Sequence, residues 1–183
     1  KSNTQRVEIA ETKGILNYIK SSKVKIDFAL KKINFKRFVE MSNKTNQFNS
    51  NYQRIKINKL KSLYENQRFK IITFSVSDKY SDSGIIASLI VEKLKETHSI
   101  IEFLISCRAL GRGLEYIFIN QIIKKFSIKN LSIHYIKTER NQPFIKFANE
   151  IKSGKDKKSY FVNFNKIYKI ASKYEKYIKF KSY

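Results

Sequence analysis

Hydrophobic residues recur along this chain with two spacings, one typical of strands and one typical of helices. Short apolar runs, or apolar residues alternating with polar ones, predict strands. Apolar residues three to five positions apart predict helices that bury one face. The predicted strands are residues 24–30, 69–77, 85–94, 99–106, 131–137, 160–164 and 177–181, and the predicted helices are residues 1–20, 34–41, 57–64, 114–126 and 142–151.

The order of these elements predicts a mixed α/β domain with a central sheet flanked by helices. Within it, residues 99–137 form a strand, helix, strand unit, whose two strands should pair in parallel. A chain of 183 residues is long enough to enclose one hydrophobic core. The longest apolar run has the length of a strand, so the sequence predicts no membrane span and no membrane partner.

Charge and cysteine content limit the possible partners and binding sites. The formal net charge is +23, but the lysines are spread along the chain together with abundant Asn, Ile, Tyr and Phe. The charge fits a phosphorylated ligand or an acidic protein as well as it fits nucleic acid. The aromatic residues mostly occupy positions with core periodicity, which argues against nucleic acid as a partner. The single cysteine excludes an internal disulfide and a cysteine-based zinc site, which is typical of a reducing cytoplasm.

Residues 106–115, SCRALGRGLE, combine the only cysteine with two of the five glycines. They lie between a predicted strand and a predicted helix, where an R-x-x-G-x-G pattern is a phosphate-binding arrangement, because backbone N–H groups and the helix dipole attract anions. The alternative is a tight turn in which Gly111 and Gly113 only relieve crowding. The candidate phosphate-binding residues are Arg108, Ala109, Leu110, Gly111, Arg112 and Gly113.

In order and spacing, this region resembles the GNAT acyltransferase fold, in which a Q/R-x-x-G-x-G/A loop after the central strand grips the pyrophosphate of coenzyme A. The resemblance implies that residues 108–113 are that loop and that Asn141, with the helix from Gln142, takes the place of the family's second cofactor motif. The Gly-Phe pair that usually ends the second motif is missing after Phe147.

Four segments resemble, in order, signatures of the C-terminal domain of FkbH-like proteins: KTNQFN (44–49), VSDKYSDSG (76–84), SCRALGRGLE (106–115) and YIKTERNQP (135–143). The resemblance implies a GNAT-like domain, residues 23–183, joined by a connector helix, residues 1–22, to an upstream haloacid-dehalogenase-like (HAD-like) phosphatase domain.

That family loads a glyceryl or related acyl group onto the phosphopantetheine arm of an acyl carrier protein. The phosphatase half needs magnesium and a D-x-D-x-T/V motif, which this chain lacks. We therefore expect no metal site in this segment.

Cys107 is the candidate acyl acceptor, because in the FkbH-like resemblance a protein thiol can hold the acyl group before the carrier arm takes it. Arg108 and the nearby helix N-terminus should favour its thiolate. The alternative is a buried cysteine, because the alternation from Ile101 to Cys107 places it on a core face. His134, on the neighbouring strand, is the candidate for proton transfer, or else a packed or solvent-facing histidine.

Several polar residues are candidates for contacts with substrate. Asn46, Gln47 and Asn49 suit sugar-like hydroxyls or a pantetheine amide. Asp78 and Asp82 can bind hydroxyls or order a turn, and loop structure is the favoured role. Thr138 and Asn141 lie where they could contact the carrier's arm.

Two other functions remain open. A stand-alone GNAT enzyme would take acetyl coenzyme A directly and acylate an amine. A non-catalytic docking module would bind the carrier protein while a missing domain performs the chemistry. Both the carrier-loading function and the docking function have an acyl carrier protein as partner. The acidic surface of that protein would be attracted to the basic chain.

Overall fold

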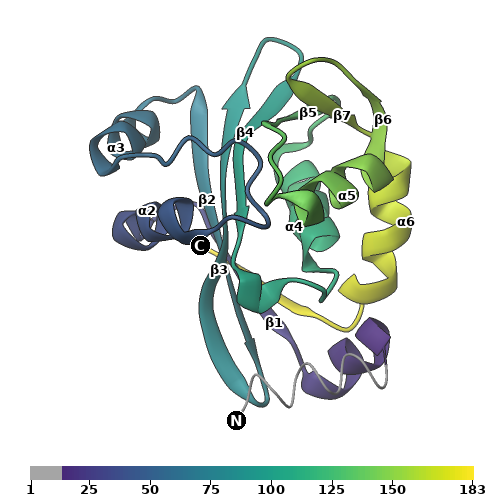
Figure 1. Ribbon diagram of the computed structural model, residues 1–183. Helices are drawn as coiled ribbons and strands as arrows, with labels where there is room; N and C mark the ends of the chain where they lie inside the picture. Colours follow the sequence, from purple (N-terminus) through teal and green to yellow (C-terminus); the bar gives the residue numbers. More distant parts are fainter. Residues whose placement is uncertain (1–13) are drawn as a thin grey trace.

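The computed structural model describes residues 14–183, which form one eight-stranded sheet in the order β6-β7-β5-β4-β3-β2-β1-β8 (Figure 1). Residues 14–22 are helical. The strands are β1 (Lys25–Ala29), β2 (Phe69–Asp78), β3 (Ser81–Lys93), β4 (His98–Ile105), β5 (Leu131–His134), β6 (Lys152–Lys155), β7 (Ser159–Val162) and β8 (Lys179–Ser182). The helices are α2 (Phe35–Lys44), α3 (Ile57–Glu65), α4 (Leu114–Phe126), α5 (Gln142–Ile151) and α6 (Phe164–Glu175), with a 3-10 turn at Cys107–Ala109. The predicted mixed α/β class is confirmed.

Local signals explain where several helices begin. The Asn34 side chain accepts a hydrogen bond from the Arg37 backbone N–H at 3.0 Å and so caps the start of α2. Pro143 lies in the first turn of α5, where its missing N–H does no harm. Asn163 caps α6 in the same way as Asn34 caps α2.

The C-terminal region differs from the prediction. The sequence suggested two strands and nothing between them, whereas the structure inserts α6 between β7 and β8 and adds β6 before β7. Only Ile167 and Ala171 of α6 are buried, so its apolar stripe is too narrow to stand out among lysines and tyrosines. β6 is a short edge strand around Gly154 with no buried residue.

Helices cover both faces of the sheet. On one face α2 and α3 pack Phe38, Met41 and Leu60 against the strands, and on the other lie the helix of residues 14–22, α4, α5 and α6 (Figure 1). Tyr18 and Ile19, in the helix of residues 14–22, belong to this second core. That helix is therefore packed into the domain rather than merely leading to it, and residues 1–13 of the predicted connector lie outside the described residues.

The central strands diverge, and this shapes the site. β4 pairs with β5 in parallel, as predicted, but only from His98 to Ile100. A β-bulge follows, because Val91 of β3 pairs with Ile100 while Ile90 pairs with Glu102, two residues further along β4. Bulges bend a strand and end regular pairing. The second half of β4 thereby leaves β5, and a wedge opens between them.

The wedge is filled by residues 48–50 of the loop between α2 and α3, which we call the inserted segment (Figure 1). The Ser50 N–H donates to the Phe103 carbonyl at 3.0 Å, and the Ile105 N–H donates to the Phe48 carbonyl at 3.0 Å. On the other side, the Ile136 N–H donates to the Ser50 carbonyl at 2.8 Å. The inserted segment thus bridges the diverging strand β4 and the chain after β5.

Candidate functional site

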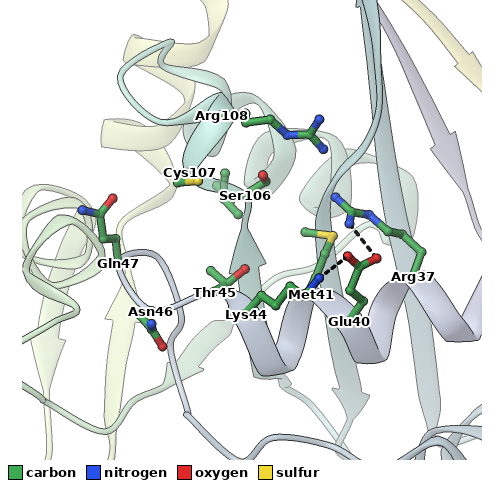
Figure 2. Close-up of a pocket in the computed structure, with 11 residues that line it drawn as sticks. Arg37, Glu40, Met41, Lys44, Thr45, Asn46, Gln47, Ser106, Cys107 and Arg108 are labelled. Atoms are coloured by element: carbon green, nitrogen blue, oxygen red, sulfur yellow. Dashed lines mark hydrogen bonds and ion pairs between the residues drawn. The ribbon is translucent and has the colours of Figure 1, made fainter.

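A cavity of about 730 Å³ lies at the C-terminal end of β4, on the face covered by α2 (Figure 2). Its walls come from two segments that are far apart in sequence: α2 with the start of the loop after it, and the turn that follows β4. The main contributors are Arg37, Glu40, Met41 and Lys44 of α2, Thr45, Asn46 and Gln47 of the loop, and Ser106, Cys107 and Arg108. The predicted motifs at 44–49 and 106–115 therefore meet here.

Cys107 is exposed and lines this cavity. The alternative that strand alternation buries it is wrong, because β4 ends at Ile105 and Cys107 begins a 3-10 turn. The Ser106 N–H still donates to the Ile86 carbonyl at 2.8 Å, whereas the Ala109 N–H already turns back to the Ser106 carbonyl at 2.8 Å. The thiol is therefore presented to the cavity at the point where the strand becomes a turn.

The charges around the thiol are mostly positive. Glu40 accepts hydrogen bonds from Lys44 at 3.0 Å and Arg37 at 2.9 Å, and these bonds hold the pKa of its carboxyl below the ordinary value. Arg108 is exposed and extends toward Arg37 across the cavity (Figure 2). Three cations thus surround one carboxylate that two of them already satisfy, so the cavity can accept an anion.

A second cavity, of about 710 Å³, adjoins the first and shares Arg37, Glu40 and Arg108 with it. It extends along α2 toward Gly84, near the β2–β3 hairpin. Together the two cavities give the thiol an elongated approach route with cationic side chains along it.

The glycine loop has the backbone conformation that its sequence requires. Gly111 and Gly113 have φ angles of 75° and 67°, which L side chains rarely adopt, and Gly113 directly precedes α4. The Arg112 side chain is buried and donates to the Arg108 carbonyl at 2.5 Å, while its guanidinium lies 6.0 Å from the centre of the Tyr18 ring. Of the predicted loop residues, Arg108 is the one whose side chain lines the cavity.

Ala109 and Leu110 serve packing. Ala109 is fully buried, and Leu110 packs against the core. Any contact that these two residues make with a phosphate would have to come from their backbones.

Glu115, in the first turn of α4, was not among the predicted site residues. Its Oε2 atom is buried and has no hydrogen-bond partner within the described part of the chain. Burial raises the pKa of this carboxyl to about 7, and the nearby Glu150 carboxylate adds to the shift. The sequence places Glu115 at a helix start, where acidic residues are common, but gives no sign that its carboxyl is buried.

The raised pKa predicts how stability depends on pH. The folded chain retains a proton on Glu115 that the unfolded chain loses above the ordinary carboxyl pKa, so this group's contribution to stability falls as the pH rises from about 4.5 to 7. We expect the free energy of unfolding to fall more between pH 5 and pH 8 in the wild type than in Glu115→Gln, by up to about 3 kcal/mol. Urea unfolding measures both. Glu139→Gln, at an exposed position, should follow the wild type, and parallel pH curves for wild type and Glu115→Gln would contradict the expectation.

The three predicted amides have different surroundings. Gln47 is exposed at the cavity, whereas the Asn46 side-chain oxygen accepts a hydrogen bond from Arg54 at 2.5 Å. Asn49 is fully buried, and its side chain donates to Thr45 and accepts from the backbone of Asn51 and Tyr52. Asn49 therefore shapes the loop, and its predicted contact with substrate is not supported by its position.

Asn141 and Thr138 form a second internal network. The Asn141 amide donates to the carbonyls of Asn49 at 3.0 Å and Ile136 at 2.8 Å, and its oxygen accepts from the Thr138 N–H at 2.9 Å and hydroxyl at 3.2 Å. Asn141 is fully buried. Its side chain is thus used inside the protein, which disagrees with the predicted contact to a cofactor or carrier arm.

Asp78 and Asp82 stabilise the β2–β3 hairpin, the role that the sequence favoured. Asp78 accepts hydrogen bonds from the backbones of Tyr80 and Ser81 and from the Tyr18 hydroxyl at 2.7 Å. Asp82 accepts from the Gly84 N–H at 2.8 Å. Neither aspartate lines the cavity at Cys107.

His134 does not meet Cys107. β4 and β5 are in register at Ile100 and Ile133, so His134 lies one residue beyond that pair while Cys107 lies seven beyond it. A difference of six residues along the strand direction corresponds to roughly 20 Å between His134 and Cys107. The prediction that His134 assists a reaction at this thiol therefore conflicts with the geometry.

Neither a metal site nor a membrane span is evident within residues 14–183. No three His, Cys, Asp or Glu side chains gather there in a way that could bind a metal ion. No helix in that range has the length and apolar character needed to cross a bilayer.

Comparisons with known proteins identify the fold. No protein-family model matches the chain, and no curated protein is significantly similar to it in sequence. Among solved structures, it is similar to PaiA N-acetyltransferase from Thermoplasma acidophilum in complex with coenzyme A, with 12% identity, a TM-score of 0.51, and coverage of 74% of this chain and 96% of that one.

It is also similar to the ribosomal-protein-S18-alanine N-acetyltransferase from Escherichia coli, with 9% identity, a TM-score of 0.50, and coverage of 76% of this chain and 90% of that one. The predicted GNAT-like fold is confirmed, and at these identities the likeness establishes the fold alone.

Proposed function

We propose that this chain is an acyltransferase domain that holds an acyl group as a thioester on Cys107 and passes it to the phosphopantetheine thiol of an acyl carrier protein. One observation carries the proposal: the only thiol of the chain is exposed in a cationic cavity at the end of the central strand of a GNAT fold. Free cysteines are usually buried, so an exposed thiol lining a cavity calls for a chemical role.

The chemistry needs no redox step. The Cys107 sulfur, after losing its proton to water, attacks the acyl carbonyl and forms the C–S bond, while the bond to the donor's leaving group breaks and that group departs with the electron pair. In the second step, the carrier's deprotonated thiol attacks the thioester, and Cys107 leaves as a thiolate. Arg108, Arg37 and Lys44 line the cavity, and we assign to them the binding of a phosphate on the donor or on the carrier's arm.

Coenzyme A and the carrier-bound phosphopantetheine have the same pantetheine arm, so the chain would accommodate the arm of either group in the same way. The glycine loop offers a turn before α4 that suits a phosphate. The inserted segment bonds to Phe103 and Ile105 and so occupies the edge of β4 with which an extended arm would otherwise pair. The elongated approach along α2 is therefore the route that we assign to the arm.

The resemblance to FkbH-like proteins supports the wider context. In that context, an upstream HAD-like domain would prepare the acyl donor with the help of magnesium, and the present domain would transfer it. The net charge of +23 is complementary to the acidic surface of a carrier protein and would speed their encounter.

A direct test is to load the chain. We expect incubation with the glyceryl thioester of N-acetylcysteamine to increase the mass of the 183-residue chain by one glyceryl group, and the modified peptide to contain Cys107. Intact and peptide mass spectrometry measure this. A glyceryl group found only on lysines, or none at all, would refute the thioester.

A second candidate is direct acylation of an amine, which is favoured by the fold shared with two N-acetyltransferases. It predicts turnover of acetyl coenzyme A with an amine acceptor that persists in Cys107→Ala. The proposed thioester route predicts no such turnover.

A further inference from the structure

A separate cavity of about 450 Å³ lies on the same face of the sheet as the Cys107 cavity, beside α3. It shares no lining residue with the Cys107 cavity. Its apolar wall includes Leu63, Phe69 and Ile90, and Glu102 of β4 contributes a carboxyl group. The volume lies within the range of about 300 to 1,000 Å³ that small-molecule sites occupy.

Glu102 is the unusual feature of this cavity. The residue is 2% exposed, and its Oε1 atom is buried without a hydrogen-bond partner among residues 14–183. The bulge in β4 sets Glu102 opposite Ile90, within an otherwise apolar part of the sheet. Burial raises the pKa of this carboxyl to about 8, even though Arg54 acts in the opposite direction. At neutral pH Glu102 is therefore mostly protonated and has an O–H to donate.

The charges that face Glu102 are mainly positive. Arg54 and Lys56 line the cavity from the loop before α3, and Lys59 lines it from α3. Glu92 of β3 lines it as well, but its carboxylate is paired with Arg68 at 2.9 Å. With Glu102 protonated, the net charge that lines the cavity is positive, and these cations repel an ammonium group and attract an anion.

We propose that this cavity binds a small organic carboxylate, which accepts a hydrogen bond from the Glu102 carboxyl and places its hydrocarbon part against Leu63, Phe69 and Ile90. The lysines at the rim balance the charge of the bound carboxylate. This site is independent of acyl transfer at Cys107, so either proposal can fail without the other.

Butyrate and n-butylamine are suitable probes, because each has four carbon atoms in an unbranched chain and they carry opposite charges. In a titration of the 183-residue chain at pH 6.5, we expect butyrate to shift the backbone NMR signals of residues 63, 90 and 102 and butylamine to leave them unchanged. Cys107→Ala should bind butyrate as the wild type does. Preference for butylamine, or no response to butyrate, would overturn the proposal.

Two substitutions test the role of the carboxyl. Glu102→Leu removes the hydrogen-bond donor and should weaken butyrate binding by about tenfold or more, while raising the melting temperature, because an unpaired buried polar group is lost. Glu102→Gln keeps a donor that does not titrate, so its binding should remain constant from pH 6.5 to 9 while the wild type weakens over that range. Unchanged binding in Glu102→Leu, or equal pH dependence in wild type and Glu102→Gln, would contradict the assignment.

Discussion

Cys107→Ala is expected to reduce acyl transfer to a holo acyl carrier protein by roughly 10³-fold or more, because the covalent intermediate then has no sulfur on which to form. Binding of the carrier should persist, since the cations of the cavity, Arg37, Lys44 and Arg108, remain in place. The rate of acyl-carrier formation measures the first effect, and a binding titration measures the second. The two together separate loss of chemistry from loss of the partner.

Two further variants complete this experiment, one to trap the acyl intermediate and one as a control. Cys107→Ser replaces the thiol by a weaker nucleophile with a poorer leaving group, so it should transfer slowly and accumulate an acyl ester that mass spectrometry detects. Ser153→Ala, at an exposed position on β6 far along the sheet order from β4, is the control and should match the wild type. Full transfer by Cys107→Ala would instead refute the thioester on Cys107 and would favour the alternatives that need no such intermediate, among them a docking module whose chemistry occurs elsewhere.

Sequence patterns predicted those elements whose burial is strong and local. Leu114, Ile117, Phe118 and Ile122 of α4 are all buried, so their spacing appears directly in the sequence. The apolar run that precedes α4 in the sequence forms β4, which is buried along most of its length. α6 escaped prediction because only two of its residues, Ile167 and Ala171, are buried. β6 escaped prediction because it is an edge strand with no buried residue and so shows no alternation of apolar and polar positions.

The inserted segment shows why part of the site was beyond prediction. The sequence identified residues 44–49 as a polar loop, and that loop does reach the cavity through Gln47. The sequence could not show that residues 48–50 pair with β4. This pairing depends on the bulge in β4, which lies about fifty residues later in the chain and separates β4 from β5. Such a distant backbone contact leaves no periodicity in either segment.

The candidate side chains fall into two groups, those exposed at the cavity and those bonded inside the protein, for a related reason. Cys107, Arg108 and Gln47 follow the ends of buried elements and are exposed at the cavity, as a functional role requires. Asn49 and Asn141 have equally suitable chemistry, but each satisfies backbone groups nearby. An amide serves a ligand or a loop with the same atoms, so the residue type alone does not distinguish the two roles.

Asn141→Ala is expected to lower the free energy of unfolding by about 3 kcal/mol, because it removes a buried side chain that makes four hydrogen bonds. The change leaves the carbonyls of Asn49 and Ile136 without their side-chain donor in a buried environment. The inserted segment should loosen as well, since the Asn49 carbonyl is its attachment to the start of α5. Urea unfolding measures the global effect, and hydrogen exchange at the Ser50 and Ile136 amides measures the local one.

A matched control distinguishes this role from contact with a ligand. Asn43 is an exposed amide on α2 that donates to the Val39 carbonyl within its own helix, so Asn43→Ala should change stability by no more than about 0.5 kcal/mol. If Asn141 bound a carrier arm instead, Asn141→Ala would raise KM for the carrier and leave both unfolding and exchange unchanged. Because the Asn141 amide already bonds to two carbonyls inside the protein, we expect the opposite: a large loss of stability and faster exchange at the inserted segment even in the absence of any carrier.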